Sequence, residues 1–207
     1  MGVALFVSYG SLHYELAWVY LILFFICVTG ITVYLFLFDK HLLKSRLGAG
    51  PVAETRTTQK IIQSIAGLSF LAIYILSALD YKNKCSNVPL LFSYSSDVVC
   101  ILAFALLFYV FKQNKFLSAT IEVQPNQEVI STGLYGIVRH PMYTGAFILL
   151  LSTPIALGSY YGLLPVLVLV VVIIYRAIDE EKELKQNLQG YEEYCRKIKY
   201  RLIPFVF

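Results

Sequence analysis

The sequence predicts an all-α integral membrane protein with five transmembrane helices, the last two forming a hairpin, and an amphipathic tail on the cytoplasmic side. Two observations lead to this class. Of the 207 residues, 58% are hydrophobic and only 14% are charged, a composition typical of membrane proteins. The apolar residues also gather in long runs, and roughly 20 such residues span a bilayer as a helix. We expect one membrane domain over residues 1–207.

The first three helices follow from uncharged runs. Residues 16–38 carry no charge and are long enough to cross the membrane. This run lacks the basic segment and the small-residue cleavage site of a signal peptide, so we expect it to be retained. Residues 61–79 form the second helix. The third continues over residues 98–111 and begins near Phe92, although its strictly uncharged part is short.

Two polar segments separate these helices. Residues 39–60 contain several basic side chains, and Gly48, Gly50 and Pro51 indicate a loop. Residues 80–97 form a shorter polar connection that contains asparagine and proline.

The fourth and fifth helices follow from the longest uncharged stretch. Residues 141–175 include no charged side chain, and the sequence Gly-Ser-Tyr-Tyr-Gly interrupts them at residues 158–162. This pattern predicts two spans folded into a hairpin. The polar segment before the hairpin, residues 124–140, and the segment after it, residues 176–181, should therefore lie at the same membrane face.

The basic residues predict the orientation. With five spans, fifteen of the 17 Lys and Arg fall on one side, and only Lys82 and Lys84 fall on the other. The positive-inside rule then places the N-terminus outside and the C-terminus in the cytoplasm. The membrane would be the plasma membrane in a prokaryote and the endoplasmic reticulum in a eukaryote. Topology accounts for the net charge of +4, so we expect no nucleic-acid partner.

The tail after the fifth helix is amphipathic. Leu184 and Leu188 are four residues apart, and Gly190 suits a helix C-cap. Apolar residues then repeat with helical spacing at Tyr191, Tyr194, Cys195 and Ile198. We expect two short helices that lie against the membrane face or over a site.

Five short motifs occur in order in the C-terminal half. They are Gly133-x-Tyr135, Arg139-His140-Pro141-x-Tyr143-x-Gly145, Arg176-x-x-x-Glu180-Glu181, Gly190-Tyr191-x-x-Tyr194 and Tyr200-Arg201-Leu202-Ile203-Pro204. Together they resemble the isoprenylcysteine carboxyl methyltransferase family and its relatives, the phospholipid and thiol methyltransferases of membranes. The resemblance covers residues 124–207, whereas the N-terminal half matches only in being hydrophobic helices.

The resemblance implies an S-adenosylmethionine-dependent methyltransferase that releases S-adenosylhomocysteine and uses no metal. Its partners would be membrane lipids and a lipophilic or prenylated acceptor, by resemblance the α-carboxylate of a prenylcysteine. A carboxylate is already ionised at pH 7 and needs no strong base, which fits motifs without a Cys-His or Ser-His pair. The four cysteines also lack metal-ligand spacing. Residues 112–207 would bind the cofactor and carry the catalysis. The sequence sets no oligomeric state.

The resemblance assigns the methyl donor to the His-Pro-x-Tyr segment, which is His140, Pro141, Met142 and Tyr143. On the residues alone, this segment could also be a helix cap with an interfacial His and Tyr. Tyr135 offers a stacking face to the adenine. The backbone before it could meet the adenine edge at Gln124, Gln127, Glu128, Val129 and Ile130. A plain solvated loop is the alternative, because the family often has a His there and this chain has none.

Arg176 and Glu180 share a helix face and are the expected catalytic residues. The resemblance assigns Arg176 to the acceptor carboxyl and Glu180 to the donor, whose ribose hydroxyls or amino group a carboxylate can hold. A surface salt bridge between the two is the alternative. Glu181 is also expected at the donor, although it could equally pair with Lys185. Arg139 could bind the acceptor carboxylate or simply follow the positive-inside rule.

Other functions remain open. A phosphatidylethanolamine amine or a thiol as acceptor would need a base, for which Glu180, Glu181 and His140 are the nearby candidates. A nicotinamide-dependent sterol-type reductase has a similar C-terminal half, but such reductases tend to follow Arg-His with Asn-Tyr and an acidic residue, where this chain has Pro-Met-Tyr-Thr-Gly. No basic cluster for a 2′-phosphate is evident either. A structural membrane protein is the non-enzyme alternative.

Overall fold

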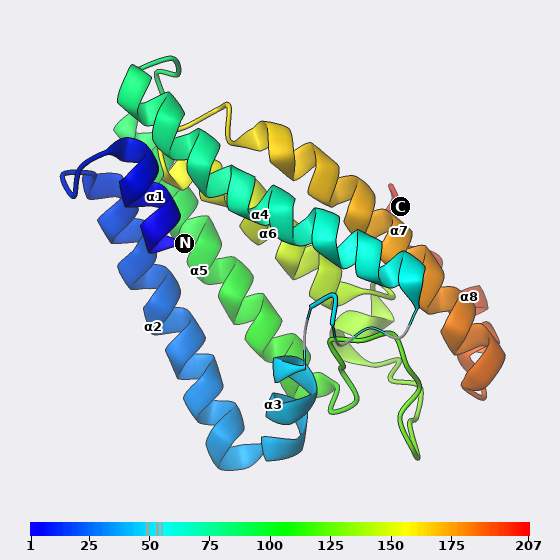
Figure 1. The fold of residues 1–207 in the computed structure, drawn as a ribbon. Coiled ribbons are helices and arrows are strands. Elements are labelled where there is room, and N and C mark those ends of the chain that lie inside the picture. Colours follow the sequence, from blue (N-terminus) through cyan, green and yellow to red (C-terminus); the bar gives the residue numbers. More distant parts are fainter. Residues whose placement is uncertain (49, 53, 55) are drawn as a thin grey trace.

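The computed structural model describes residues 1–48, 50–52, 54 and 56–207. Within this part of the chain there are eight α-helices, one short 3₁₀ helix and no strand (Figure 1). The predicted all-α class is thus confirmed. Three helices are long and apolar enough to cross a membrane: α2 (Glu15–Phe38), α4 (Thr57–Asn83) and α5 (Leu90–Gln113). They correspond to the first three predicted spans.

The outer surface of these helices is apolar. Phe25 on α2, Leu68 on α4 and Leu102 on α5 are each more than half exposed, at 58%, 70% and 62%. A soluble protein rarely exposes so much contiguous apolar surface, whereas lipid is a suitable solvent for it. The exposed faces therefore support an integral membrane protein.

Two short helices were not predicted. Helix α1 (Gly2–Tyr9) packs against the end of α4, and α3 (Lys40–Leu47) lies inside the segment predicted to be a loop. The Asp39 side chain caps α3 by accepting a hydrogen bond of 2.9 Å from the backbone N–H of Leu42. The loop prediction for residues 39–60 is thus wrong for α3 and for the start of α4 at Thr57. Ala49, Ala53 and Thr55 of that segment lie outside the described residues.

The connection between the second and third spans is shorter than predicted. Helix α4 extends to Asn83 and α5 begins at Leu90, so residues 84–89 make the turn. Asp97 lies within α5 and is buried there, which agrees with a third helix that begins near Phe92 but not with a polar connection that extends to residue 97.

The longest uncharged stretch forms two consecutive helices, α6 (Pro141–Ala156) and α7 (Leu163–Asn187). The chain reverses between them, where Gly158 adopts a left-handed conformation with φ of 75°. The Asp80 carboxylate of α4 fixes this turn by accepting hydrogen bonds from Ser159 Oγ and from the backbone of Tyr161. That both α6 and α7 cross the membrane stays a prediction, because α6 is short, with 16 residues.

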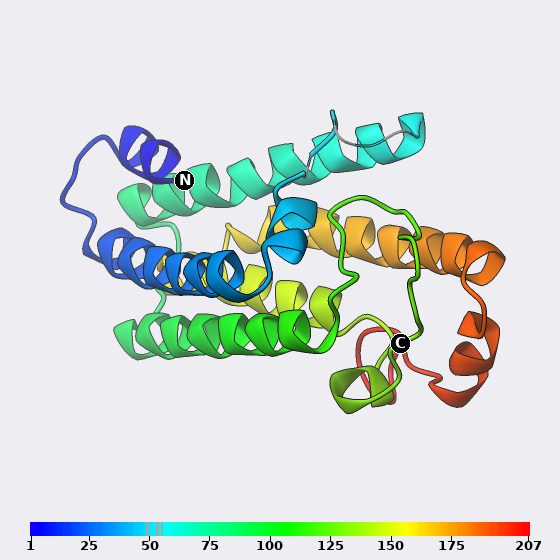
Figure 2. The same ribbon diagram turned by 90° about the horizontal axis from the view of Figure 1, so that it is seen from below.

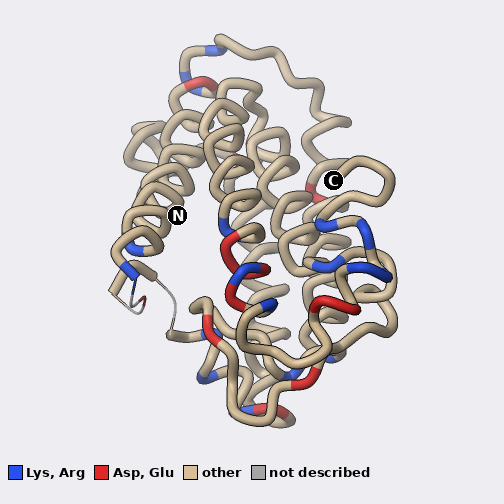
Figure 3. The backbone as a smooth tube through the Cα atoms, turned by 90° about the vertical axis from the view of Figure 1, so that its right-hand side faces the viewer, with Lys and Arg blue, Asp and Glu red and all other residues tan. Residues whose placement is uncertain are grey.

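Most of the polar segments of the chain lie at one end of the helix bundle. Helix α4 lies beside α7 and α5 beside α6 (Figures 1 and 2). This end contains the last turns of α2, α5 and α7 and the first turns of α4 and α6. Helix α3, residues 114–140 and α8 (Tyr191–Lys197) also lie there. We call it the polar end. Most Lys and Arg lie there (Figure 3), as the sequence predicts, and which side of the membrane it faces stays a prediction.

The tail differs from the prediction in one helix. Leu184 belongs to the last turns of α7 rather than to a separate helix, so only α8 is distinct. Gly190 lies between α7 and α8 in a left-handed conformation with φ of 83°. The predicted apolar stripe is buried in one cluster made of Leu184, Leu188, Tyr191 and Tyr194.

Candidate active site

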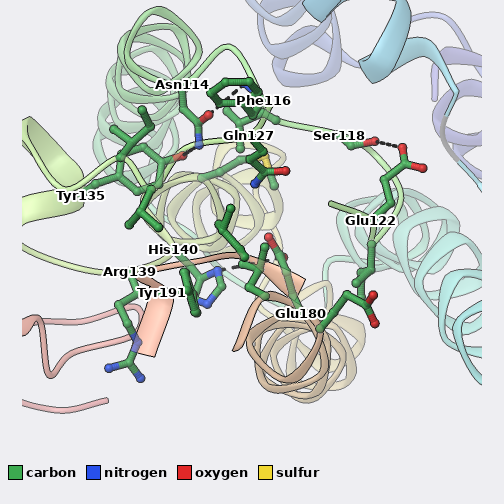
Figure 4. A pocket seen from close by; sticks show the side chains of 18 of the residues that line it. Asn114, Phe116, Ser118, Glu122, Gln127, Tyr135, Arg139, His140, Glu180 and Tyr191 are labelled. Carbon is green, nitrogen blue, oxygen red and sulfur yellow. Dashed lines mark hydrogen bonds and ion pairs between the residues drawn. The ribbon is translucent and has the colours of Figure 1, made fainter. Parts of the chain in front are cut away.

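A cavity opens at the polar end, between residues 114–130, the start of α6, the second half of α7, and α8 (Figure 4). The space between its lining residues is about 820 Å³, and this figure includes open solvent. Its charged lining residues are four carboxylates and two guanidinium groups: Glu122, Glu128, Glu180, Glu183, Arg139 and Arg176.

The first turn of α6 is held in place by the C-terminal motif. His140 caps the helix and Pro141 occupies its first position, where proline is favoured because its missing N–H would be unpaired anyway. The backbone N–H groups of Arg139 and His140 donate to the carbonyls of Tyr200 and Arg201, at 2.9 Å each. The Tyr-Arg-Leu-Ile-Pro segment therefore braces the Arg-His-Pro turn, although the bonded residues are 61 positions apart (139 to 200 and 140 to 201).

Helices α6 and α7 meet at Glu180. The hydroxyl of Tyr143 donates a hydrogen bond of 2.6 Å to Glu180 Oε2, and His140 Nδ1 lies 4.0 Å from the same carboxylate oxygen. The rings of His140 and Tyr143 stack with centroids 5.5 Å apart. The structure thus brings the His-Pro-x-Tyr segment and the Arg-x-x-x-Glu segment to one wall of the cavity.

Glu181 points away from the cavity into a buried ion cluster. Its carboxylate accepts hydrogen bonds from Arg139 Nε at 2.7 Å and Arg201 Nε at 3.1 Å, and His140 Nε2 lies 3.3 Å away. Burial by itself raises the pKa of Glu181, but the contacts with His140 and Arg139 outweigh it and lower the pKa to about 2. Glu181 does not line the cavity and does not pair with Lys185. The geometry favours a positioning role over donor binding.

Arg139 lines the cavity, but its guanidinium points away from the other lining side chains, as Figure 4 shows. Its Nη1 donates to the carbonyls of Ile198 at 2.7 Å and Lys199 at 3.0 Å, in addition to the Nε bond to Glu181. The side chain is only 6% exposed. Arg139 therefore ties the tail to α7, and this geometry favours positioning over contact with an acceptor.

Arg176 lies at the cavity wall and is bound by a distant segment. Its Nη1 donates to Glu54 Oε1 at 2.9 Å, and its Nη2 donates to the carbonyl of Ala119 at 2.6 Å. Burial lowers the pKa of Arg176, but the neighbouring Tyr143 and the Glu54 carboxylate outweigh it and raise the pKa above its ordinary value. The alternative of a surface salt bridge with Glu180 is wrong, because Arg176 pairs with Glu54 instead.

Most of the predicted site residues line this cavity: Gln127, Glu128, Val129, Ile130, Tyr135, Arg139, His140, Met142, Tyr143, Arg176 and Glu180. Three predicted residues do not line it, namely Gln124, Pro141 and Glu181. The backbone N–H of Gln124 bonds the Gln127 side chain at 2.8 Å, so this pair shapes the loop. The roles of all these residues remain predictions.

Sequence reasoning missed several lining residues. Asn114, left without a role in the sequence, donates to the Tyr135 hydroxyl at 3.0 Å, and Glu122 lies on the opposite wall. Tyr191 and Tyr194 of α8 close one side, and the Tyr194 hydroxyl donates to the Tyr135 carbonyl at 2.8 Å. The helical spacing of the two tyrosines predicted their burial, and the tail was expected either against the membrane face or over a site; the structure places α8 beside the cavity.

Comparison with known proteins connects this cavity with a membrane enzyme family. The model of the phospholipid methyltransferase family matches residues 92–190, just under half of the chain. That segment contains every residue lining the cavity except Tyr191 and Tyr194.

Two curated relatives are named as sterol reductases and not as methyltransferases. A Delta(14)-sterol reductase of Mus musculus is 34% identical over 91 residues, which is 42% of this chain and 22% of the relative. A Delta(14)-sterol reductase of Schizosaccharomyces pombe is 29% identical over 90 residues, or 42% of this chain and 21% of the relative. The match spans about a fifth of the length of each relative. The chain is thus a helical membrane protein whose residues 92–190 are similar to the phospholipid methyltransferase family.

Proposed function

We propose that this chain is a membrane methyltransferase that uses S-adenosylmethionine and acts on a lipophilic acceptor. The observation that carries the proposal is the charge of the cavity. Four glutamates line it; Glu183 pairs with Arg56, and the two arginines in the wall pair with Glu181 and Glu54. Glu122, Glu128 and Glu180 are thus left without a Lys or Arg partner among the described residues. S-adenosylmethionine carries a sulfonium, an ammonium and one carboxylate group, and an acidic lining attracts its net positive charge.

The residues around Glu180 fit that ligand. The Tyr143 hydroxyl holds the Glu180 carboxylate at the cavity wall, from which the carboxylate can accept charge-assisted hydrogen bonds from an ammonium group or hydrogen bonds from ribose hydroxyls. The irregular backbone of residues 127–130 can pair with the adenine edge. When bound, S-adenosylmethionine would supply an electrophilic methyl group. The walls would align the methyl group with the acceptor and exclude water.

The acceptor proposed by resemblance is the α-carboxylate of a prenylcysteine. This nucleophile needs no proton removal at pH 7, which fits a cavity whose lining contains no cysteine or lysine. An amine or thiol acceptor would need a base, and His140 and Glu180 at the cavity wall are the candidates. The apolar exterior of the bundle suits an acceptor that arrives from the lipid.

A sterol reductase that uses a nicotinamide dinucleotide is the second candidate, because both curated relatives are named as sterol reductases. The cavity argues against it, since a phosphorylated dinucleotide carries several negative charges and needs basic partners. A purely structural role is weaker still, because it does not account for polar motifs from four segments meeting at one cavity.

The test is methyl incorporation. The purified protein in lipid nanodiscs is incubated with S-adenosylmethionine labelled in its methyl group and with either N-acetyl-S-farnesylcysteine or a membrane lipid extract, and label in the organic phase is counted. We expect incorporation by the native protein and a loss of about ten-fold or more in Glu180→Gln, the effect of one charge-assisted hydrogen bond. Glu193→Gln on the exposed face of α8 is the matched control and should behave as native. Absence of label with the farnesylcysteine and with every lipid fraction would reject the proposal.

A further inference from the structure

An exposed apolar loop lies at the edge of the polar end. Residues 202–207 read Leu-Ile-Pro-Phe-Val-Phe and contain no charged or polar side chain. Phe205 is 86% exposed, Val206 is 76% exposed and Ile203 is 37% exposed. Adjacent apolar side chains that stand out from a loop typically mark a surface that meets another apolar phase. The loop therefore calls for a partner.

The packing of the loop places it beside the uncharged stretch of α6 and α7. Leu202 is buried in one cluster with Tyr143 of α6 and Ile173 of α7, and Phe207 packs against the same cluster. Tyr143 and Ile173 both belong to residues 141–175, which carry no charge. Figure 3 shows the C-terminus at the border between the charged side chains of the polar end and the uncharged part of the bundle. The loop thus lies at the level where the apolar exterior of the bundle begins.

The backbone of the loop makes its own hydrogen bonds. The carbonyl of Phe207 accepts three backbone N–H groups, those of residues 201–203, at 2.9, 2.8 and 3.1 Å. The N–H groups of Val206 and Phe207 donate to the carbonyl of Ile203 at 3.2 and 3.1 Å. Backbone groups that meet lipid must be paired inside the protein, because lipid offers them no partner. This loop can therefore touch the bilayer without exposing these groups to it.

Charged side chains flank the apolar tip as they do in segments that lie at a membrane surface. Lys197 and Lys199 precede the loop and are exposed, so they can meet the phosphate groups of lipids. Arg201 turns inward at the base of the loop. Its Nε donates to Glu181 at 3.1 Å, and its guanidinium lies 5.1 Å from the centre of the Phe207 ring. The charges thus stay at the base, and the tip is wholly apolar.

From these features we propose that residues 203–206 insert into the bilayer, at the depth of the head groups and the first acyl carbons, and that lipid is the partner of this loop. Transfer of the exposed side chains of Phe205 and Val206 from water into lipid is favourable, as is any burial of apolar surface. Lipid is also the partner next to hand, because the loop adjoins the apolar exterior of the bundle. The inference does not depend on the proposed enzymatic activity.

The inserted loop would also hold part of the candidate active site. The carbonyls of residues 200–202 accept hydrogen bonds from the N–H groups of Arg139 and His140 and from the hydroxyl of Thr144, at 2.9, 2.9 and 2.7 Å. These three donors belong to the turn that begins α6 and to its first residues. A loop seated in lipid would thereby fix this turn, so the contact with the bilayer helps to position His140.

Tryptophan fluorescence of the purified protein in lipid nanodiscs tests the insertion. The chain has one tryptophan, Trp18, so Trp18→Phe supplies a background without tryptophan. Three probes are placed in this background one at a time. They are Phe205→Trp in the loop, Val171→Trp on the exposed apolar face of α7, and Glu193→Trp on the exposed face of α8. Each is measured with phosphatidylcholine brominated on its acyl chains close to the head group, and with iodide in the water.

We expect brominated lipid to quench Phe205→Trp about as strongly as Val171→Trp, and iodide to quench it much less than Glu193→Trp. Strong quenching by iodide, with no more quenching by lipid than in Glu193→Trp, would overturn the proposal because the loop would then lie in water. Quenching by neither would also overturn it, because a protein surface, such as a second copy of this chain, would then cover the loop.

Hydrogen exchange tests the connection with the site. Phe205→Ser combined with Val206→Ser removes the apolar tip, and the backbone amides of residues 139–140 report on the turn. We expect these amides to exchange about ten-fold or more faster, a loss of about 1.4 kcal/mol or more of local stability. Val3→Ser combined with Val7→Ser, which alters two exposed valines of α1, is the matched control and should leave them unchanged. Native exchange in the loop variant would overturn the claim that lipid contact holds the turn.

Discussion

Replacing Glu181 by glutamine should destabilise the protein strongly while leaving its shape nearly unchanged. The side chain is 3% exposed and holds Arg139, His140 and Arg201 together. Glutamine has the same size but no charge, so the substitution leaves the buried Arg139 guanidinium without a counter-ion. Removing one partner of a buried ion pair typically costs about 3–5 kcal/mol.

The pKa of Glu181 gives an independent magnitude. Lowering the pKa from its ordinary 4.5 to about 2 corresponds to about 3 kcal/mol of stability. Because the folded-state pKa is the lower one, this stability is fully present above pH 4.5 and is lost as the pH falls from 4.5 towards 2. The native protein should therefore lose more stability than Glu181→Gln across that interval.

The assay is thermal unfolding followed by circular dichroism in detergent. For a chain of this length, 3 kcal/mol lowers the Tm by roughly 6–12 °C. Glu193→Gln, which removes an exposed carboxylate from α8, is the control and should leave the Tm unchanged. If Glu181→Gln has the Tm of the native protein at neutral pH, the buried cluster does not stabilise the fold as we argue.

Three further substitutions test other parts of the structure. Tyr143→Phe removes the 2.6 Å hydrogen bond to Glu180 and should weaken S-adenosylhomocysteine binding about ten-fold in calorimetry, as expected for a bond to a charged group. Gly133→Ala should lower the Tm, because φ is +59° and a Cβ would lie 1.7 Å from Gln113 Nε2. Asp97→Leu should raise the Tm, because the buried Asp97 carboxylate has no hydrogen-bond partner among the described residues.

Each of these three substitutions has a control variant or an outcome that would contradict the prediction. Tyr109→Phe alters an exposed tyrosine of α5 and should not affect ligand binding, whereas equal losses in both tyrosine variants would point to a general effect. Gly67→Ala meets nothing within 4 Å, so the two glycine variants should differ in Tm. A lower Tm for Asp97→Leu would show that the carboxylate has a partner or a structural role.

The long spans could be predicted because each contains a continuous uncharged run, although Asp97 shortens this run in α5. The order of apolar runs and basic loops places α2, α4 and α5 within a few residues of their observed bounds. The order of the spans also places the start of α6 and the end of α7 at the same membrane face. It therefore predicts that His140 and Glu180 lie close together.

The remaining parts depend on contacts between distant residues. Helix α3 is too short and polar for a periodicity signal, although Asp39 is a recognisable N-cap. The partner of Arg176 is Glu54, 122 positions earlier, and no local pattern relates the two. Similarly, the brace between the Arg-His-Pro turn and the Tyr-Arg-Leu-Ile-Pro segment uses backbone groups, which carry no side-chain signature.

The central claim is that the cavity containing Glu180 binds an S-adenosyl amino acid, the methyl donor or its product, rather than a dinucleotide. Calorimetric titration of the purified protein with S-adenosylhomocysteine and with NADPH tests it most directly. We predict micromolar binding of S-adenosylhomocysteine, no binding of NADPH, and a loss of about 1.4 kcal/mol or more in Glu180→Gln. Binding of NADPH without binding of S-adenosylhomocysteine would contradict the claim and favour the reductase activity for which the two curated relatives are named.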